Sequence, residues 1–471
     1  MAVCQAPAIQ WKKNIGGSGN DTDLKVIQNY LGDVFIAGNT TSSSSFDVPA
    51  NNGGADIFVA KVNSSNGSLI WKKNYGGSAN DYLAGLDACS DGGVILLCHS
   101  GSTSGPLNQV GVWLVKINND GSEVFKVFRG GNPTDGGNVI QTQDGGFAFV
   151  STKTVTGNGL DLWVVKTNSA GAQTWQKTIG GTGEEYAADI IEDSGNFYVL
   201  GGSFSPSVNS QNNHQSGTSD LLSFKLDNAG NTIWTRLFGG TKEEIPASIV
   251  KGDGAEIILL GSTNSIDGNI FFGYGGYDAW ICNVDSDTGF LNTNSSTGGT
   301  KDDFSSGMYF DALDSSPIIT ATIYSDSVGN QAVTNSPNIL VAELVPFGGE
   351  SWVLSLGGTN LDSAMAIIGT VDGGYLVAGH SYSNNGDIPN NYGGADFYLA
   401  KLNFPCPTEL VLGAANFRGS ISRTSDSFIK TSSVFDAPPS KVKLTSGYVL
   451  MEPGFEVKSG VVFETQIGGC P

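Results

Sequence analysis

Histidine is scarce in this 471-residue sequence, which contains only His99, His214 and His380. A zinc site needs three or four convergent ligands, and a serine–histidine–aspartate triad needs a histidine beside its nucleophile. His99 and His380 fall at the same position of two repeats, without a third ligand in register. No glycine-rich phosphate loop opens a helix, because no segment has a convincing helical pattern. We therefore expect no metal centre, no cofactor and no catalysis, although the 45 acidic residues neither supply nor exclude a glycosidase carboxylate pair.

Basic residues are also few, with 24 lysines and arginines against 45 acids and a formal net charge of −21. Acids and bases balance within residues 404–471, so the first 403 residues carry the whole excess. Such a surface repels nucleic acid and anionic lipid, and we expect neither as a partner. No run of 18 apolar residues exists, so we also expect no membrane insertion. The partner should be neutral or basic, which favours a glycan or a surface protein.

The six cysteines lack the spacing of a metal site. Cys89 and Cys98 are expected to be separate buried thiols, and Cys282 takes a place that lysine holds in four other repeats. The first residues, Met1–Pro7, show neither the basic nor the apolar region of a signal peptide. The composition, rich in glycine, asparagine, serine and threonine, is nevertheless typical of exported proteins. We expect a mature or trimmed form of a protein located outside the cell or on its surface, with a cytosolic protein as the alternative.

Glycine is abundant, at 66 residues, and it marks a repeat. A Gly-Gly pair begins at seven positions: Gly16, Gly76, Gly130, Gly180, Gly239, Gly298 and Gly357. Five positions before six of these pairs stands an aromatic residue: Trp11, Trp71, Phe125, Trp175, Trp234 and Trp352. The remaining copy has Thr293 there and is degenerate. Five positions after each first glycine stands an acid: Asp21, Asp81, Asp135, Glu185, Glu244, Asp303 and Asp362. Self-similarity at a fixed period indicates a repeat architecture.

Each repeat contains four short segments rich in β-branched and aromatic residues, separated by Asp-Gly and Asn-Gly turns. Four antiparallel strands at this period predict a blade of a β-propeller. The chain opens with an aromatic strand, and its last repeat ends at the segment Asp396–Asn403. We therefore expect an all-β fold with seven blades within residues 1–403, in which the strand of Trp11 completes the seventh blade. Residues 184–193 have an apolar spacing that also fits a helix, but their register in the repeat predicts a strand.

Residues 404–471 follow a different pattern, with very short strands broken by Gly447, Gly454 and Gly460. The segment 406–470, with Pro-Gly-Phe at 453–455 and a closing Cys470, resembles a three-coathanger stack domain. The repeats resemble the propeller repeats of large surface proteins of gliding Bacteroidetes, and the turn before Trp234 resembles the tryptophan-docking motif of quinoprotein-like propellers. We expect a disulfide between Cys406 and Cys470, which bracket this small domain and would stabilise it by up to about 4 kcal/mol.

The resemblance to gliding Bacteroidetes proteins also carries functional implications. It implies export by a type IX secretion system, with the outer-membrane secretion machinery as a transient partner. Gliding adhesins belong to the same group of proteins, which implies a link to surface attachment. The signal peptide and the sorting domain usual in that group are not recognisable in this sequence.

The seven recurring acids allow two interpretations. They could form a ring of carboxylates around the central axis, able to hold Ca²⁺, or each could cap local backbone N–H groups, which the recurrence in every blade favours. Two loops share the form Asp-Val/Ile-Pro-x-Asn-x-Gly-Gly-Ala-Asp, and their end residues are weak Ca²⁺ candidates: Asp47, Asp56, Asp387 and Asp396. A hydrogen-bonded loop conformation is the simpler interpretation of this pattern.

One irregular stretch in the fifth repeat combines glycines with four aromatic residues: Phe271, Phe272, Tyr274 and Tyr277. Such a loop can present rings to a sugar or a partner protein, or the rings can cover the edge of the blade. Three hypotheses for the whole chain follow. We favour a secreted or cell-surface binding module, followed by a structural spacer of a larger surface assembly and then by an extracellular polysaccharide-active enzyme. Convergent acids in a deep pocket would indicate the enzyme, and an exposed aromatic patch would indicate the binding module.

Overall fold

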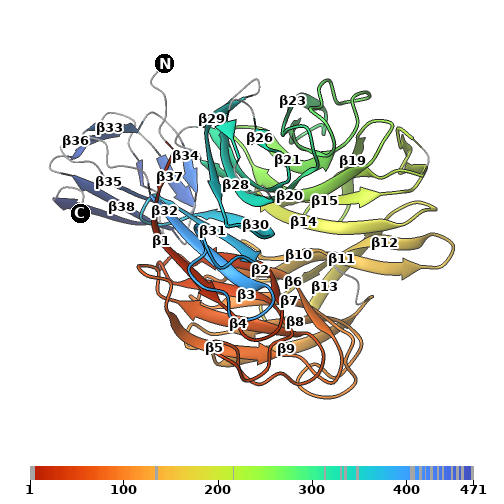
Figure 1. The fold of residues 1–471 in the computed structure, drawn as a ribbon. Coiled ribbons are helices and arrows are strands. Elements are labelled where there is room, and N and C mark those ends of the chain that lie inside the picture. Colours follow the sequence, from red (N-terminus) through yellow and green to blue (C-terminus); the bar gives the residue numbers. More distant parts are fainter. Residues whose placement is uncertain are drawn as a thin grey trace.

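The computed structural model describes residues 6–403, except 133–135, 216, 312–314, 329–330, 334–336 and 346–348, and the strands found within residues 409–467. Every regular element in this described part of the chain is a β-strand. No helix in it is long and apolar enough to cross a membrane. Seven four-stranded antiparallel sheets surround a central axis, so the fold is a seven-bladed β-propeller, as predicted (Figure 1).

The four strands of each blade run in order from the axis outward, as first to fourth. Blades 1 to 3 are β2 (Asp21–Gln28), β3 (Val34–Thr40), β4 (Asp56–Val62), β5 (Leu69–Tyr75); β6 (Asp81–Ala88), β7 (Val94–Ser100), β8 (Gly111–Ile117), β9 (Glu123–Gly130); and β10 (Asn138–Gln141), β11 (Phe147–Val155), β12 (Gly159–Thr167), β13 (Gln173–Ile179). Blades 4 and 5 are β14 (Glu185–Asp193), β15 (Asn196–Ser203), β18 (Asp220–Leu226), β19 (Thr232–Phe238); and β20 (Glu244–Lys251), β21 (Glu256–Thr263), β22 (Asp278–Asp285), β23 (Leu291–Thr297). Blades 6 and 7 are β24 (Asp303–Asp311), β25 (Ser316–Ile323), β28 (Asn338–Leu344), β29 (Glu350–Leu356); and β30 (Asp362–Gly369), β31 (Tyr375–Ser381), β32 (Asp396–Asn403), β1 (Ala8–Ile15).

The N-terminal strand closes the ring, as predicted. β1 pairs antiparallel with β32, with Trp11 opposite Lys401, and it is the outermost strand of blade 7. The segment with helix-like spacing is the strand β14, so the repeat register overrides the local pattern. Short hairpins extend two loops: β16 (Ser207–Val208) with β17 (Gln211–Asn212), and β26 (Ser327–Val328) with β27 (Gln331–Ala332).

The hydrophobic core lies between neighbouring blades. The second and third strands are buried on both faces, as the fully buried strands β3, β7 and β8 show. One cluster joins Phe35 and Val59 of blade 1 to Leu86 and Trp113 of blade 2. Each blade buries one face against the preceding blade and the other against the following blade. Blade 7, completed by β1, packs in the same way against blade 1 and closes the ring.

The propeller has two different faces. The Gly-Gly face carries the Gly-Gly loops and the long loops between second and third strands, whereas the turn face carries the tight turns that join the other strands. On the turn face five of the recurring aromatic residues act as docking rings, each lying on a turn glycine of the next blade. A Cβ added to Gly67 would meet Trp11 at 2.7 Å, and one added to Gly230 would meet Trp175 at 2.9 Å. Both indoles donate their N–H to a turn carbonyl, of Ser64 at 3.0 Å and of Asn228 at 3.0 Å.

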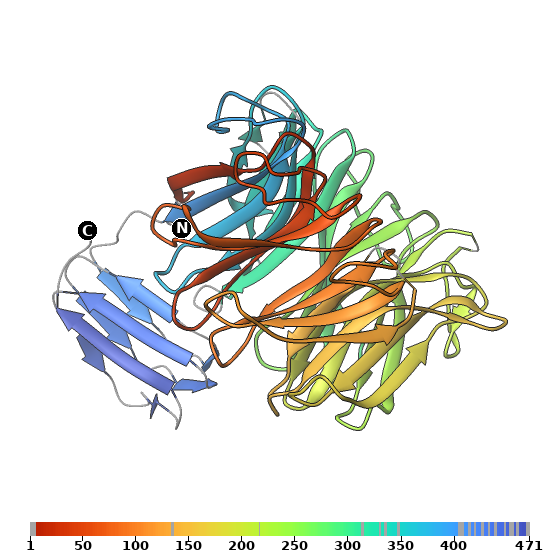
Figure 2. The same ribbon diagram turned by 90° about the horizontal axis from the view of Figure 1, so that it is seen from below.

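Beyond Asn403 the described strands pair in parallel, in three sheets of three strands that stack beside the propeller (Figure 2). The sheets are β33 (Glu409–Leu412), β36 (Phe428–Thr431), β39 (Val449–Met451); β34 (Asn416–Arg418), β37 (Val434–Ala437), β40 (Glu456–Val457); and β35 (Ile421–Thr424), β38 (Ser440–Ser446), β41 (Val461–Ile467). The boundaries 1–403 and 404–471 remain predictions.

The cysteines within the described residues are buried free thiols: Cys89, Cys98 and Cys282. Cys89 and Cys98 are therefore separate thiols, as expected. The expectation that Cys282 takes the place of the lysine is wrong by one residue. That place belongs to Asn283, which lies opposite Ile258 in blade 5 as Lys401 lies opposite Leu376 in blade 7. The expected pair Cys406–Cys470 lies outside the described residues, and so does Cys4.

Candidate functional site

The recurring acids are buried at the start of the first strands, where they hold the Gly-Gly loops. In blade 1 Asp21 accepts the N–H of Gly17 at 2.7 Å, the hydroxyl of Ser42 at 3.1 Å and the hydroxyl of Thr40. The same bond to the second glycine recurs for Asp81, Glu185, Glu244, Asp303 and Asp362. Capping is thus confirmed for these six acids, which do not form an exposed ring around the axis; Asp135 lies outside the described residues.

A second buried acid lies at or near the start of the third strand in five blades: Asp56, Asp161, Asp220, Asp278 and Asp396. In each of them Oδ1 is buried without a hydrogen-bond partner. The first glycine of the Gly-Gly pair separates the two acids, since a Cβ on Gly16 would lie 2.1 Å from Asp396 Oδ1 and 2.8 Å from Asp21 Oδ2. Only glycine fits between two carboxylates that approach so closely, which explains why the first residue of each Gly-Gly pair is a glycine.

These paired carboxylates hold protons more tightly than exposed acids. Burial raises the pKa of Asp396 to about 7, and the nearby charges of Asp21 and Asp47 add to the effect. Burial, with the charge of the neighbouring acid, likewise raises the pKa of Asp56 and of Asp278 to about 6. At neutral pH Asp396, between blades 7 and 1, therefore lies close to its titration midpoint.

The weak Ca²⁺ candidates have structural partners. Asp56 accepts the N–H of Asn52 at 2.7 Å, and Asp396 accepts that of Tyr392 at 2.6 Å, so both hold the conformation of their loops. Asp387 forms an ion pair with Lys12 at 3.1 Å. Asp47 lies in the loop between β3 and β4, where its backbone N–H donates to the carbonyl of Gly16 at 3.0 Å. Across the described residues no group of three or more histidine, cysteine or acidic side chains is arranged to hold a metal ion.

The histidines are dispersed around the ring. His99 Nε2 lies 3.1 Å from Ser151 Oγ, and His214 Nδ1 lies 2.6 Å from Asp220 Oδ2. The bond to Asp220 raises the pKa of His214. His380 is buried in blade 7, and burial lowers its pKa. His99 and His380 occupy equivalent places on second strands, as the repeat predicts.

The aromatic stretch of blade 5 lies in the loop between β21 and β22, on the Gly-Gly face. We call residues 264–277 the blade 5 loop. Phe271 is 71% exposed, Phe272 75% and Tyr274 55%, so three of the four predicted rings face solvent. Ile266, in the same loop, is 69% exposed and lies beside Gly273. The interpretation that these rings cover the blade edge is therefore wrong for the three exposed rings.

The blade 5 loop is held rigidly at both ends. The buried side chain of Ile270 anchors its middle, and Asp267 accepts the backbone N–H of Thr241 at 2.8 Å. The Tyr274 N–H donates to Asp278 at 2.6 Å. Four large apolar side chains are thus presented on a fixed backbone, which lowers the entropy cost of binding.

The fourth predicted ring, Tyr277, joins a row of rings that crosses neighbouring blades. Its hydroxyl donates to Glu243 at 2.7 Å, and burial and that carboxylate raise its pKa. Its ring lies 5.0 Å from that of Phe304, which lies 6.3 Å from that of Tyr324 in an edge-on contact. On blade 4 the ring of Tyr186 lies 5.9 Å from that of Phe204. We call these five residues the aromatic strip.

Sequence reasoning missed four members of the aromatic strip and Ile266. Tyr186 and Phe304 directly follow the recurring acids Glu185 and Asp303. Tyr82 stands at the same position of its repeat, so the sequence contained a signal for these two rings. Phe204 and Tyr324, each 36% exposed, stand directly before the serines that bond to the recurring acids, a position that also holds Tyr382. The contacts of Tyr186 with Phe204 and of Phe304 with Tyr324 each lie within one blade, whereas the contact of Tyr277 with Phe304 joins blades 5 and 6.

Comparison with known proteins supports the fold. No protein-family model matches the chain, and a search of curated proteins finds no match. Drosophila Semaphorin 2a is similar in structure over 86% of this chain and 76% of its own, with 8% identity and a TM-score of 0.50. A protein of unknown function from Dyadobacter fermentans aligns over 85% of this chain and 100% of its own, with 11% identity and a TM-score of 0.47. An α-L-arabinofuranosidase from Fusarium graminearum aligns over 68% and 93%, with 11% identity and a TM-score of 0.45. A propeller fold by itself does not decide between binding and catalysis.

Proposed function

We propose that this propeller is a binding and adhesion module that works outside the cell and performs no catalysis. Its binding surface is the Gly-Gly face over blades 4 to 6, formed by the blade 5 loop and the aromatic strip. The observation that carries the proposal is the exposure of Phe271, Phe272 and Tyr274 on an anchored loop. Exposed rings without a local packing partner mark interaction sites rather than cores.

A glycan chain is the ligand that fits this surface best. Flat rings on a rigid backbone offer an apolar platform to the faces of sugar rings, while Glu243 and Asp302 beside them accept hydrogen bonds from hydroxyl groups. The net charge of −21 disfavours anionic ligands and favours neutral ones. A neutral surface polysaccharide therefore satisfies both conditions, and a surface protein is the second candidate.

The resemblance to surface proteins of gliding Bacteroidetes supports the cellular setting of the proposal. In that setting the protein leaves the cell through a type IX secretion system and contributes to gliding or attachment at the exterior of the outer membrane. The chain outside the blade 5 loop and the aromatic strip then serves as a scaffold that presents them.

The test is a triple substitution, Phe271→Ser with Phe272→Ser and Tyr274→Ser, followed by binding to a panel of neutral polysaccharides. We expect loss of binding by at least tenfold, with an unchanged melting temperature, because the three rings contribute no core contacts. Phe290→Ser is the matched control: Phe290 is 64% exposed on the turn face, where Arg236 lies over its ring.

The outcomes separate the three hypotheses. Unchanged binding in the folded triple variant would show that the three rings are not the binding surface. Failure to bind any polysaccharide or surface protein would favour a structural spacer. Hydrolysis of a polysaccharide by the purified protein, abolished by one carboxylate substitution, would establish an enzyme and overturn the proposal.

A further inference from the structure

One blade interface lacks a docking ring. Five interfaces on the turn face hold the ring of Trp11, Trp71, Phe125, Trp175 or Trp234 against a turn glycine of the next blade. At the same position of blade 5 stands Thr293, which is exposed and lies opposite Asn283 in the sheet. The Asn283 amide donates to the Thr293 hydroxyl at 3.1 Å, so these two short side chains bond to each other instead of covering the next blade.

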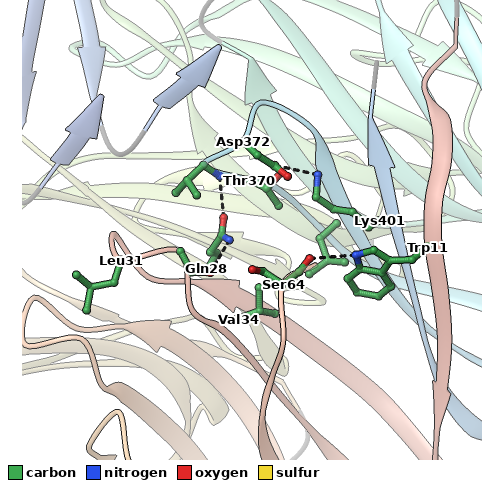
Figure 3. Close-up of a pocket in the computed structure, with 11 residues that line it drawn as sticks. Trp11, Gln28, Leu31, Val34, Ser64, Thr370, Asp372 and Lys401 are labelled. Carbon is green, nitrogen blue, oxygen red and sulfur yellow. Dashed lines mark hydrogen bonds and ion pairs between the residues drawn. The ribbon is translucent and has the colours of Figure 1, made fainter. Parts of the chain in front are cut away.

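A hollow of about 330 Å³ lies where that ring would dock, between blades 5 and 6. Its lining is mixed: it has apolar side chains, which include Ile258, Ile281, Phe310, Pro317 and Leu344, and polar ones, among them Asn294 and Ser295. We call this hollow the socket. The equivalent site between blades 7 and 1 has a hollow of only about 210 Å³, because Trp11 lies in it (Figure 3). The socket is thus larger than its counterpart, and the side chain missing from it is an aromatic ring.

None of the described residues that line the socket is basic. In five blades a lysine lies opposite the docking ring: Lys61, Lys116, Lys166, Lys225 and Lys401. Lys401 forms an ion pair with Asp372 at 2.9 Å, beside Trp11 (Figure 3). In the socket that place is taken by the neutral Asn283, while the acids Asp253 and Glu256 line the rim.

One lysine, Lys251, lies beside this rim, but its ammonium group is already bonded to backbone carbonyls. The ammonium of Lys251 donates to the backbone carbonyls of Gly252 at 3.2 Å, Gly254 and Glu256 at 3.0 Å, within the turn itself. It caps this turn rather than extending over the apolar side chains. The socket therefore combines apolar side chains around a space large enough for a ring with two acids at its rim.

We propose that the socket binds an aromatic side chain that stands next to a positive charge on a partner protein, such as a tryptophan beside a lysine. The same molecule displays this recognition in five other places, where a ring lies on the neighbouring blade and a lysine lies beside it. A partner that supplies both groups completes the interface between blades 5 and 6. The socket lies on the turn face, so this inference is independent of the proposed glycan surface.

The test uses tryptamine, an indole with an ammonium group, and indole-3-acetate, an indole with a carboxylate, in equilibrium dialysis with the full chain. We expect one site for tryptamine and at least tenfold weaker binding of indole-3-acetate. Thr293→Trp should fill the socket from within, raise the melting temperature and abolish tryptamine binding. Thr293→Leu replaces it if the tryptophan variant does not fold.

Trp175→Thr is the matched control, because it opens a second socket that still contains the pair Lys166–Asp144, at 2.9 Å. That socket should take neutral indole without a preference for tryptamine. The triple serine variant of the blade 5 loop should bind tryptamine as the unmodified protein does. Failure of tryptamine to bind, or binding that survives Thr293→Trp, would overturn the proposal.

Discussion

The two faces of this propeller use aromatic residues in opposite ways. On the turn face the rings recur at one position of successive blades, and Trp11, Trp71, Trp175 and Trp234 each donate an N–H to a turn carbonyl of the next blade. On the Gly-Gly face Phe271, Phe272 and Tyr274 occur in blade 5 alone and are exposed. The rings at the docking position build the ring of blades, whereas the exposed rings of the blade 5 loop, which interrupt the repeat, are candidates for binding.

The largest expected effect comes from removing a docking ring. Trp234 is 6% exposed, lies on Gly289 and donates to the Ser286 carbonyl at 3.2 Å. Trp234→Ala leaves a cavity between blades 4 and 5 and removes this hydrogen bond, so we expect a loss of about 3–5 kcal/mol in the free energy of unfolding. Chemical denaturation measures this value.

Removal of an exposed ring from the blade 5 loop should, in contrast, leave the free energy of unfolding almost unchanged. Phe271→Ala should change the free energy of unfolding by less than about 0.5 kcal/mol, since its ring is solvent-exposed. Equal losses in the two variants would contradict the division of roles between the faces.

An intermediate effect is expected from pH, through the buried acids behind the Gly-Gly loops. The folded chain raises the pKa of Asp396 and of Glu244 to about 7, and that of Asp56 and of Asp278 to about 6. Raised pKa values stabilise the fold fully below the ordinary range of these acids, near pH 4, and the stabilisation is lost as pH rises through 6 to 7. Calorimetry should show a lower melting temperature at pH 8 than at pH 5. A melting temperature that rises over this interval would refute the assignment.

A smaller effect than that of Trp234→Ala is expected from removing one charge from a single acid pair. Asp396→Asn should stabilise the fold by about 1–2 kcal/mol at pH 8 and have little effect at pH 5, where Asp396 is already protonated. Blade 6 shows that an amide fits this place, since Asn338 stands there beside Asp362. Denaturation curves at the two pH values check the prediction. An equal change at both would mean that charge is not the cause.

Much of the fold could be read from the sequence because the repeat supplies it seven times. The register predicted β14 as a strand and the pairing of Trp11 with the last blade, both of which the structure shows. The blade 5 loop was recognisable as an interruption of the pattern. The aromatic strip was not, because the contact of Tyr277 with Phe304 forms only where the ring brings blades 5 and 6 together. The role of Gly16 between two carboxylates also needed coordinates, since the two acids are far apart in sequence.

Hydroxyl-radical footprinting with and without a bound polysaccharide tests the central claim most directly. It reports the oxidation of individual rings in the unaltered protein, so it needs no substitution. The account predicts protection of Phe271, Phe272 and Tyr274 on ligand binding, with Phe290 on the turn face oxidised equally in both states. Protection of Phe290 with the three loop rings left unprotected would contradict it.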